Sequence, residues 1–95
     1  MPFKANNPCN KANFEAAISL FKVVAPKNEY KLEEIYLDYG AGMKWETIVC
    51  YRGINDHYQM LCPRDWDKLQ AATTPEQIAA IVRAICEDQK GLLRI

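Results

Sequence analysis

The chain has 95 residues, of which 49% are hydrophobic and 11% aromatic, and its twelve basic residues balance its twelve acidic residues. This length favours a single domain over residues 1–95 with one modest core, and the aromatic content argues against a disordered chain. Because the net charge is zero, we expect little electrostatic affinity for nucleic acid or for an anionic membrane surface.

The N-terminal part is predicted to form one helix over residues 9–24. Asn7 followed by Pro8 is typical of a helix start, since asparagine caps a helix and proline suits its first turn. Pro26 ends the helix, because the residue before a proline avoids the helical conformation. Between these limits a stripe of apolar residues recurs at helical spacing: Phe14, Ala17, Ile18, Phe21 and Val24.

The middle of the chain is predicted to form a three-stranded antiparallel meander. Ile35, Leu37 and Tyr39 alternate with other side chains at the period of a strand that is buried on one face. If these three face the helices, Tyr36 faces away. Two short turn signals, at residues 40–42 and 53–56, separate this strand from further strands at 44–52 and 57–62, and short connections require antiparallel neighbours.

Two helices are predicted after the meander. The first begins near Pro63, and the second is introduced by Thr74, Pro75 and Gln77, the order of an N-cap, a first-turn proline and a capping box. A buried stripe follows to about Asp88. The last four residues, 92–95, are expected either to add a strand or to pack loosely.

The order of elements is therefore α-β-β-β-α-α, an α+β fold in which the helices pack on one face of the sheet. The order of a helix followed by a meander is similar to that of cystatin-like folds, in which a helix lies across an antiparallel sheet. This similarity concerns architecture alone and implies no functional residues.

The segment 46–63 contains the only histidine, His57, between Cys50 and Cys62, and so raises the question of a zinc centre or a Cys–His nucleophile. Two sulfurs that bind one zinc ion lie within about 4.6 Å of each other. Whether Cys50 pairs with Gln59 or with Met60, the two cysteines are about 7–10 Å apart along the strands. We therefore expect no metal, an exposed His57, and cysteines that serve as small buried side chains: Cys50, Cys62 and Cys86.

No catalytic group of residues is evident elsewhere. Ser19 is the only serine and lies off the apolar stripe of its helix, while Glu34 and Asp38 are about 14 Å apart along one strand face, too far to share a Mg²⁺ ion. The glycines at 40 and 42 lack the third glycine and the following helix of a nucleotide-binding loop. We expect a protein that is not an enzyme and that holds no cofactor.

The predicted meander is rich in aromatic residues, and apolar groups occupy both faces of its second strand. Such a sheet is either covered on both faces or docks a partner. Tyrosine, tryptophan and arginine are typical of protein interfaces. We therefore predict an aromatic, partner-binding sheet surface formed by Tyr36, Trp45, Tyr51, Arg52 and Tyr58.

Acidic residues are concentrated in the same region, because residues 28–46 contain five acidic residues and two lysines. One interpretation is that these charges lie on the solvated faces of neighbouring elements. The other is an acidic strand surface that meets a basic partner.

Two functions agree with these observations. The first is a small non-catalytic protein-interaction module (an inhibitor, immunity protein, adaptor or self-associating subunit) that binds another protein or a second copy of itself. The alternative is a small-molecule-binding domain with a pocket between the first helix and the sheet. The sequence has neither the features of a signal peptide nor a membrane-spanning segment, so we expect no membrane partner and a cytoplasmic protein with reduced cysteines.

Overall fold

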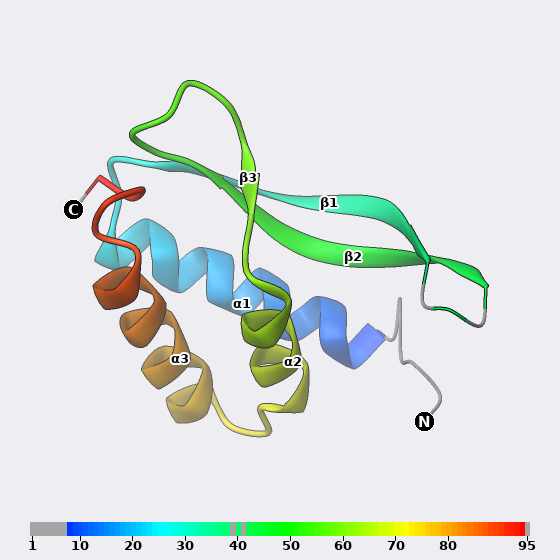
Figure 1. Ribbon diagram of the computed structural model, residues 1–95. Helices are drawn as coiled ribbons and strands as arrows, with labels where there is room; N and C mark the ends of the chain where they lie inside the picture. Colours follow the sequence, from blue (N-terminus) through cyan, green and yellow to red (C-terminus); the bar gives the residue numbers. More distant parts are fainter. Residues whose placement is uncertain (1–7, 39, 41, 95) are drawn as a thin grey trace.

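The structure is a computed structural model that describes residues 8–38, 40 and 42–94, without the side chains of 8–10, 37–38 and 43–46. Its elements follow one another in the predicted order, which confirms the α+β fold (Figure 1). They are α1 (Pro8–Val24), β1 (Glu29–Asp38), β2 (Met43–Arg52), β3 (Gln59–Met60), α2 (Pro63–Ala71) and α3 (Pro75–Asp88).

The sheet has the strand order β1-β2-β3, and both pairs are antiparallel. β1 and β2 pair along their whole length, from Glu29 opposite Arg52 to Asp38 opposite Met43. Gly40 and Gly42 in the turn between these strands have positive φ angles of 82° and 130°, which glycine adopts without steric cost. β1 is longer than predicted. It begins at Glu29, near the start of the acidic segment 28–46.

β3 is much shorter than the strand predicted over 57–62. Its two residues place Met60 opposite Cys50 and Gln59 opposite Tyr51. One further bond, from the Leu61 N–H to the Val49 carbonyl oxygen (3.0 Å), extends the contact before Pro63 begins α2. The proline suits the first turn of a helix, and so the chain leaves the sheet there.

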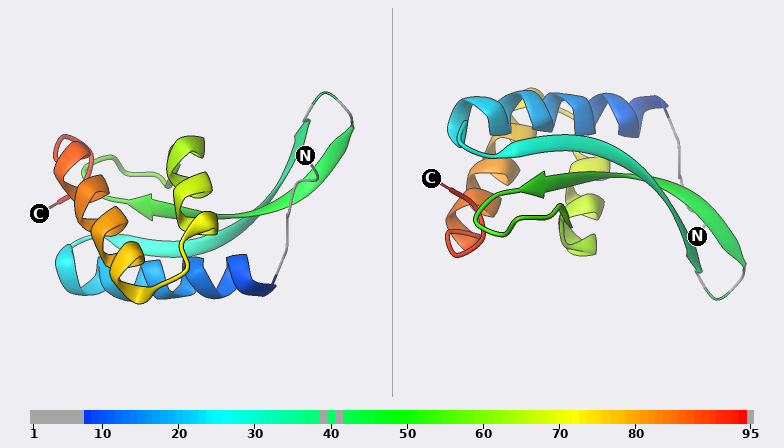
Figure 2. Two further views of the ribbon diagram at one scale, coloured as in Figure 1. Left: turned by 90° about the horizontal axis from the view of Figure 1, so that it is seen from below. Right: turned by 90° about the horizontal axis from the view of Figure 1, so that it is seen from above.

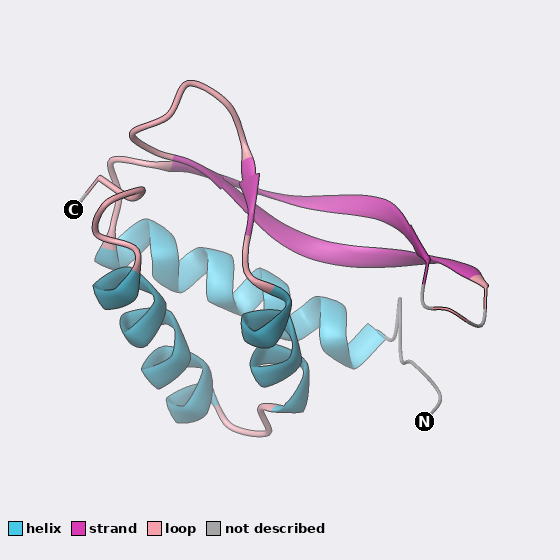
Figure 3. Ribbon diagram, viewed as in Figure 1, coloured by secondary structure: helices cyan, strands magenta, loops and turns pink. Residues whose placement is uncertain are grey.

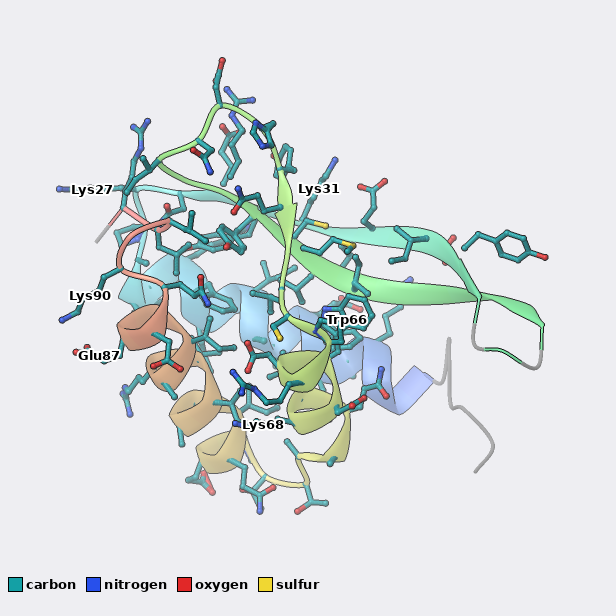
Figure 4. The ribbon with its side chains drawn as sticks, in the orientation of Figure 1. Lys27, Lys31, Trp66, Lys68, Glu87 and Lys90 are labelled. Carbon is teal, nitrogen blue, oxygen red and sulfur yellow. The ribbon has the colours of Figure 1, made fainter. Side chains whose placement is uncertain are left out.

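All three helices cover the same face of the sheet, as the views from the side show (Figures 1 and 3). α1 runs along the hairpin of β1 and β2, and α2 and α3 pack beside α1. Figure 4 places Trp66 of α2 on the helix side of the sheet. The side chains that are most completely buried come from every layer: Phe14, Phe21, Ile48, Val49, Leu69, Val82 and Leu93.

The sheet presents the opposite set of β1 residues to the helices from the set that we expected. Tyr30 stacks on Phe21 of α1, with ring centroids 5.1 Å apart, and pairs with Tyr51 across the sheet. Because alternate residues share a face, the even-numbered residues of β1 face the helices and Ile35 faces away. The packing of Tyr30 against α1 thus determines which alternate residues of β1 face the helices. Leu37 and Tyr39, two of the residues expected to face them, lie outside the described side chains.

The start of α3 has the predicted cap with a small change. The Thr74 hydroxyl accepts a hydrogen bond from the Gln77 N–H (3.2 Å). The Gln77 side chain reaches one residue further than in a standard capping box, and its Oε1 accepts from the N–H of Thr73 (2.6 Å). These bonds satisfy backbone donors that a helix start otherwise leaves exposed.

Residues 92–94, the described part of the C-terminal segment, form no strand but are anchored by a buried side chain. Asn28 is 8% exposed, and its amide binds both backbone groups of Arg94: Oδ1 accepts from the N–H (2.7 Å) and Nδ2 donates to the carbonyl oxygen (2.8 Å). The Ile54 N–H donates to the Leu92 carbonyl oxygen (2.9 Å). We call residues 92–94 with Asn28 and residues 53–54 the C-terminal anchor.

Gly53 lies inside this anchor, where the backbones approach too closely for a side chain. A Cβ atom at this position would collide with the Leu92 carbonyl oxygen and lie 2.6 Å from Asn28 Oδ1. The glycine is therefore required by close approach. Within the described part of the chain, no helix combines the length and the apolar character needed to cross a membrane.

Candidate protein-binding surface

The outer part of the β1–β2 hairpin extends past the first described residue of α1, and none of the described helices lies beneath it (Figures 1 and 2). Tyr36, two residues before the end of β1, is 52% exposed. Trp45 is directly opposite Tyr36 in the strand register, although its side chain is outside the described residues. The structure thus brings two of the five predicted binding residues together in one cross-strand pair.

Two more predicted residues, Arg52 and Tyr58, meet at Glu29 on the other end of the hairpin. Arg52 Nε lies 3.5 Å from Glu29 Oε2, and Arg52 Nη2 lies 3.2 Å from Asp56 Oδ1. The Tyr58 hydroxyl donates to Glu29 Oε1 (3.4 Å). Because these ion pairs are partly exposed to solvent, each contributes only about 0–1 kcal/mol to stability.

The predicted residues therefore do not form one continuous patch. Tyr36 lies seven residues after Glu29 along the extended strand, a distance of roughly 23 Å. Tyr36 also belongs to the helix-facing set of β1, whereas Glu29 and Arg52 belong to the opposite set. The two pairs are separate surfaces, and the hairpin end is the one that extends beyond the helices.

Tyr51, the fifth predicted residue, lies in the core. It is 4% exposed, faces the helices beside Tyr30, and its hydroxyl donates to Gln59 Oε1 (3.2 Å). Burial raises the pKa of Tyr51 above its ordinary value. The expectation that it contributes to an exposed surface is wrong, because the parity of β2 directs it toward α1.

The face of the sheet away from the helices is closed around Cys50 by side chains from both neighbouring strands. Figure 4 shows Lys31 on this side of the sheet, where its Nζ lies 4.2 Å from the centre of the Tyr58 ring and 3.0 Å from Glu33 Oε2. Tyr58 reaches from beside β3 across β2 to contact β1, and so covers the strand between them. The face of the sheet away from the helices is therefore covered near Cys50 by the side chains of Tyr58 and Lys31.

The same cover determines the chemistry of the Cys50 thiol. Cys50 is buried, and burial is the main cause of its raised pKa. The negative charge of Glu33 raises that pKa further, and the positive charge of Lys31 opposes the shift. A thiol that keeps its proton is a poor nucleophile.

The hairpin does not gather its sulfur and imidazole groups. Cys50 pairs with Met60, one of the two registers considered, and His57 lies exposed in the loop before β3. Cys86 is buried as expected, but Cys62, at the N-cap position of α2, is exposed and makes no side-chain capping bond. Among the described residues, no group of three or more histidine, cysteine or acidic side chains is placed to hold a metal ion.

The space between α1 and the sheet is filled by side chains. Phe14 and Phe21 of α1 and Val49 of β2 are each no more than 1% exposed. Four depressions on the described part of the surface are lined by residues outside α1. These observations give no support to the predicted pocket between the first helix and the sheet.

A depression with a charged lining has a volume of about 300 Å³ and lies beside the C-terminal anchor. Its charged side chains alternate in sign, and Arg52 already bridges Glu29 and Asp56 within it. Arg94 Nε donates to the Gly53 carbonyl oxygen (3.1 Å) at its edge. Three of the charged side chains that line this depression therefore already pair with one another.

No family model, curated protein or solved structure matches the chain. The candidate surface consequently depends on geometry. Its main strand was predicted, but the prediction began the strand too late: β1 begins at Glu29, six residues before Ile35, the first apolar residue of the predicted alternation. The alternation of Tyr30 and Leu32 with charged residues was the signal that could have revealed the longer edge strand.

Proposed function

We propose that the protein is a small non-catalytic interaction module that binds another protein through the β1–β2 hairpin. The observation that carries this proposal is the position of β1, a ten-residue strand at the sheet edge, in a hairpin that extends past the helices. An edge strand presents backbone groups that can pair with another chain. The exposed Tyr36 adds an aromatic contact of the kind that dominates interfaces.

Other parts of the sheet are less suited to a partner. The helices cover one face, and Tyr58 with Lys31 closes the other face near Cys50. The outer end of the hairpin lies beyond the described helices and away from Tyr58 and Lys31. This proposal includes inhibitors, immunity proteins, adaptors and self-associating subunits, because all of them need an accessible surface and no catalytic group.

We place this activity in the cytoplasm. The three cysteines whose side chains the structure describes, Cys50, Cys62 and Cys86, are all free. Free cysteines agree with a reducing compartment, where disulfides are rare.

Site-specific photo-crosslinking in the native host cells tests the proposal. A benzophenone amino acid replaces Tyr36 in the hairpin or, as a control, the exposed Arg83 on α3. We expect a discrete protein adduct from position 36 and none of the same mass from position 83. The absence of an adduct at position 36, or the same adduct from both positions, would show that the hairpin is not the binding site.

A further inference from the structure

We infer that the partner contributes an extended segment rich in lysine or arginine, which adds to the sheet as a new strand along the free edge of β1. This inference rests on the proposed function and names the chemistry of the partner at the same site.

The geometry of β1 suits strand addition. In an antiparallel pair, alternate residues direct their N–H and C=O groups away from the neighbouring strand, and on an edge strand these groups point outward. Exposed side chains occur on both faces of β1: Glu29 and Lys31 belong to the set that faces away from the helices, and Glu34 and Tyr36 belong to the other set. A strand that pairs with β1 would thus meet exposed side chains on either side of the sheet.

The charge of β1 selects the partner. The strand contains four acidic residues and one lysine, a net charge of −3. Lys31 pairs with Glu33 (3.0 Å) and Arg52 reaches Glu29 (3.5 Å), whereas Glu34 lies exposed further along the strand. Residues opposite each other on adjacent strands are about 4.5–5.5 Å apart at Cβ, close enough for opposite charges to stabilise the pair and like charges to destabilise it.

A second copy complements this edge less well than a basic segment does. In a symmetric antiparallel pair the two-fold axis keeps each residue on its own sheet face, so the pair is centred on one residue that lies opposite its copy. A pair centred on Glu33 or Glu34 sets two carboxylates opposite each other, whereas a pair centred on Leu32 sets Lys31 opposite Glu33 twice. Two β1 strands together carry a net charge of −6, whereas a basic segment neutralises the −3 of one strand.

Two synthetic peptides serve as probes, each ten residues long and blocked at both ends. One alternates lysine with valine, and the other alternates glutamate with valine. Each is added to the ¹⁵N-labelled full chain up to about 1 mM, the Kd of a weak complex, while amide chemical shifts are recorded. We expect the lysine peptide to shift the amides of β1, and the glutamate peptide to leave them unchanged.

Charge-reversal variants separate local recognition from general attraction. Glu34→Lys places a positive charge on the edge strand, and we expect it to weaken binding of the lysine peptide roughly three- to tenfold. Glu76→Lys changes the net charge equally but lies exposed at the start of α3, so it should leave the affinity nearly unchanged. Equal effects of the two variants would overturn the inference, as would shifts confined to other elements or no shifts at all.

The two proposals fail in different ways. If position 36 captures a protein in cells but the lysine peptide does not bind β1, the hairpin remains the binding surface and only the basic-strand inference is overturned. If position 36 captures nothing, the proposed function fails whatever the peptides do. A stable dimer whose copies pair through β1 would overturn the inference and leave the proposed function standing.

Discussion

Asn28, just before β1, is 8% exposed, whereas Tyr36, near the other end of the same strand, is 52% exposed. At the first position a buried amide holds the C-terminal residues, and the loop at Gly53 fits against them without room for a side chain. At the second position the hairpin extends beyond the helices (Figure 2). One strand therefore connects two different regions. We call the region around Asn28 and the C-terminal anchor the closed end, and the outer part of the hairpin around Tyr36 the open end.

This contrast teaches how a domain of this size can stabilise its fold and keep a strand edge accessible. The closed end brings together segments that are far apart in the sequence, since Asn28 and Arg94 are 66 residues apart. Bonds of this kind are buried and directional, and losing one partner leaves the other unsatisfied. Stability should therefore be sensitive to changes at the closed end and insensitive to changes at the open end.

The largest effect is expected from Gly53→Ala. The added methyl group would collide with the Leu92 carbonyl oxygen and force the loop away from the C-terminal anchor, which we expect to cost about 3 kcal/mol of unfolding free energy. Urea denaturation measures this change. Gly91→Ala is the matched control, because its added Cβ meets no atom within 4 Å, and equal losses in both variants would contradict the account.

Asn28→Ala should have the next largest effect. It removes both bonds to the Arg94 backbone and the bond to the Ala25 carbonyl oxygen, leaving buried groups without partners, at a cost of about 2 kcal/mol. Arg94→Ala keeps the backbone bonds and loses only the side-chain contact with Gly53, so it should cost less than about 1 kcal/mol. If the two variants unfold at the same urea concentration, the Asn28 amide does not anchor the C-terminus.

Alkaline pH provides a smaller effect that also depends on the closed end. Burial raises the pKa of Tyr30 to about 12, and the hydrogen bond from Asn28 partly opposes this shift. Between about pH 10 and 12 the unfolded chain loses the Tyr30 proton while the folded chain retains it, so stability falls as pH rises through this range.

Tyr30→Phe removes this titrating group. Its unfolding free energy should decrease less steeply between about pH 10 and 12 than that of the unsubstituted protein. The variant also loses the bond to the Ala25 carbonyl oxygen (2.6 Å), which should lower stability at neutral pH by about 1 kcal/mol. Parallel pH curves for the two proteins would show that Tyr30 ionises as readily in the folded chain as in the unfolded one.

The smallest effect on stability is expected from Tyr36→Ala, within about 0.5 kcal/mol, because the side chain lies at the open end. The same variant should weaken binding of the captured partner by about tenfold, the loss typical of an aromatic interface residue. Val23→Ala on α1, which removes a side chain that is 76% exposed, should change neither quantity. A Tyr36→Ala protein that unfolds readily would place this residue among those that support the fold.

Local signals were sufficient to predict the helices and the order of the strands. Pro8, Pro63 and Pro75 each mark the first residue of a helix, and Thr74 caps α3 as its sequence indicates. These features depend on residues within one turn of each other, so the sequence contains all the information that they require.

The features that were missed depend on contacts between distant segments. The faces of β1 were assigned from Ile35, Leu37 and Tyr39, but stacking of Tyr30 on Phe21 sets the opposite parity. That parity buries Tyr51. Neither the bonding of Arg94 to Asn28 nor the exposure of Cys62 can be read from neighbouring residues, because each depends on how a loop or helix leaves the sheet.

Hydrogen exchange of the backbone amides, in the free protein and in its complex with the protein captured at position 36, tests the central claim most directly. If the open end is the binding surface, alternate amides of β1 exchange more slowly in the complex, while those of Ile54 and Arg94 in the C-terminal anchor exchange at the same rate as in the free protein. Slower exchange in α2 or α3 with no change along β1 would contradict the account.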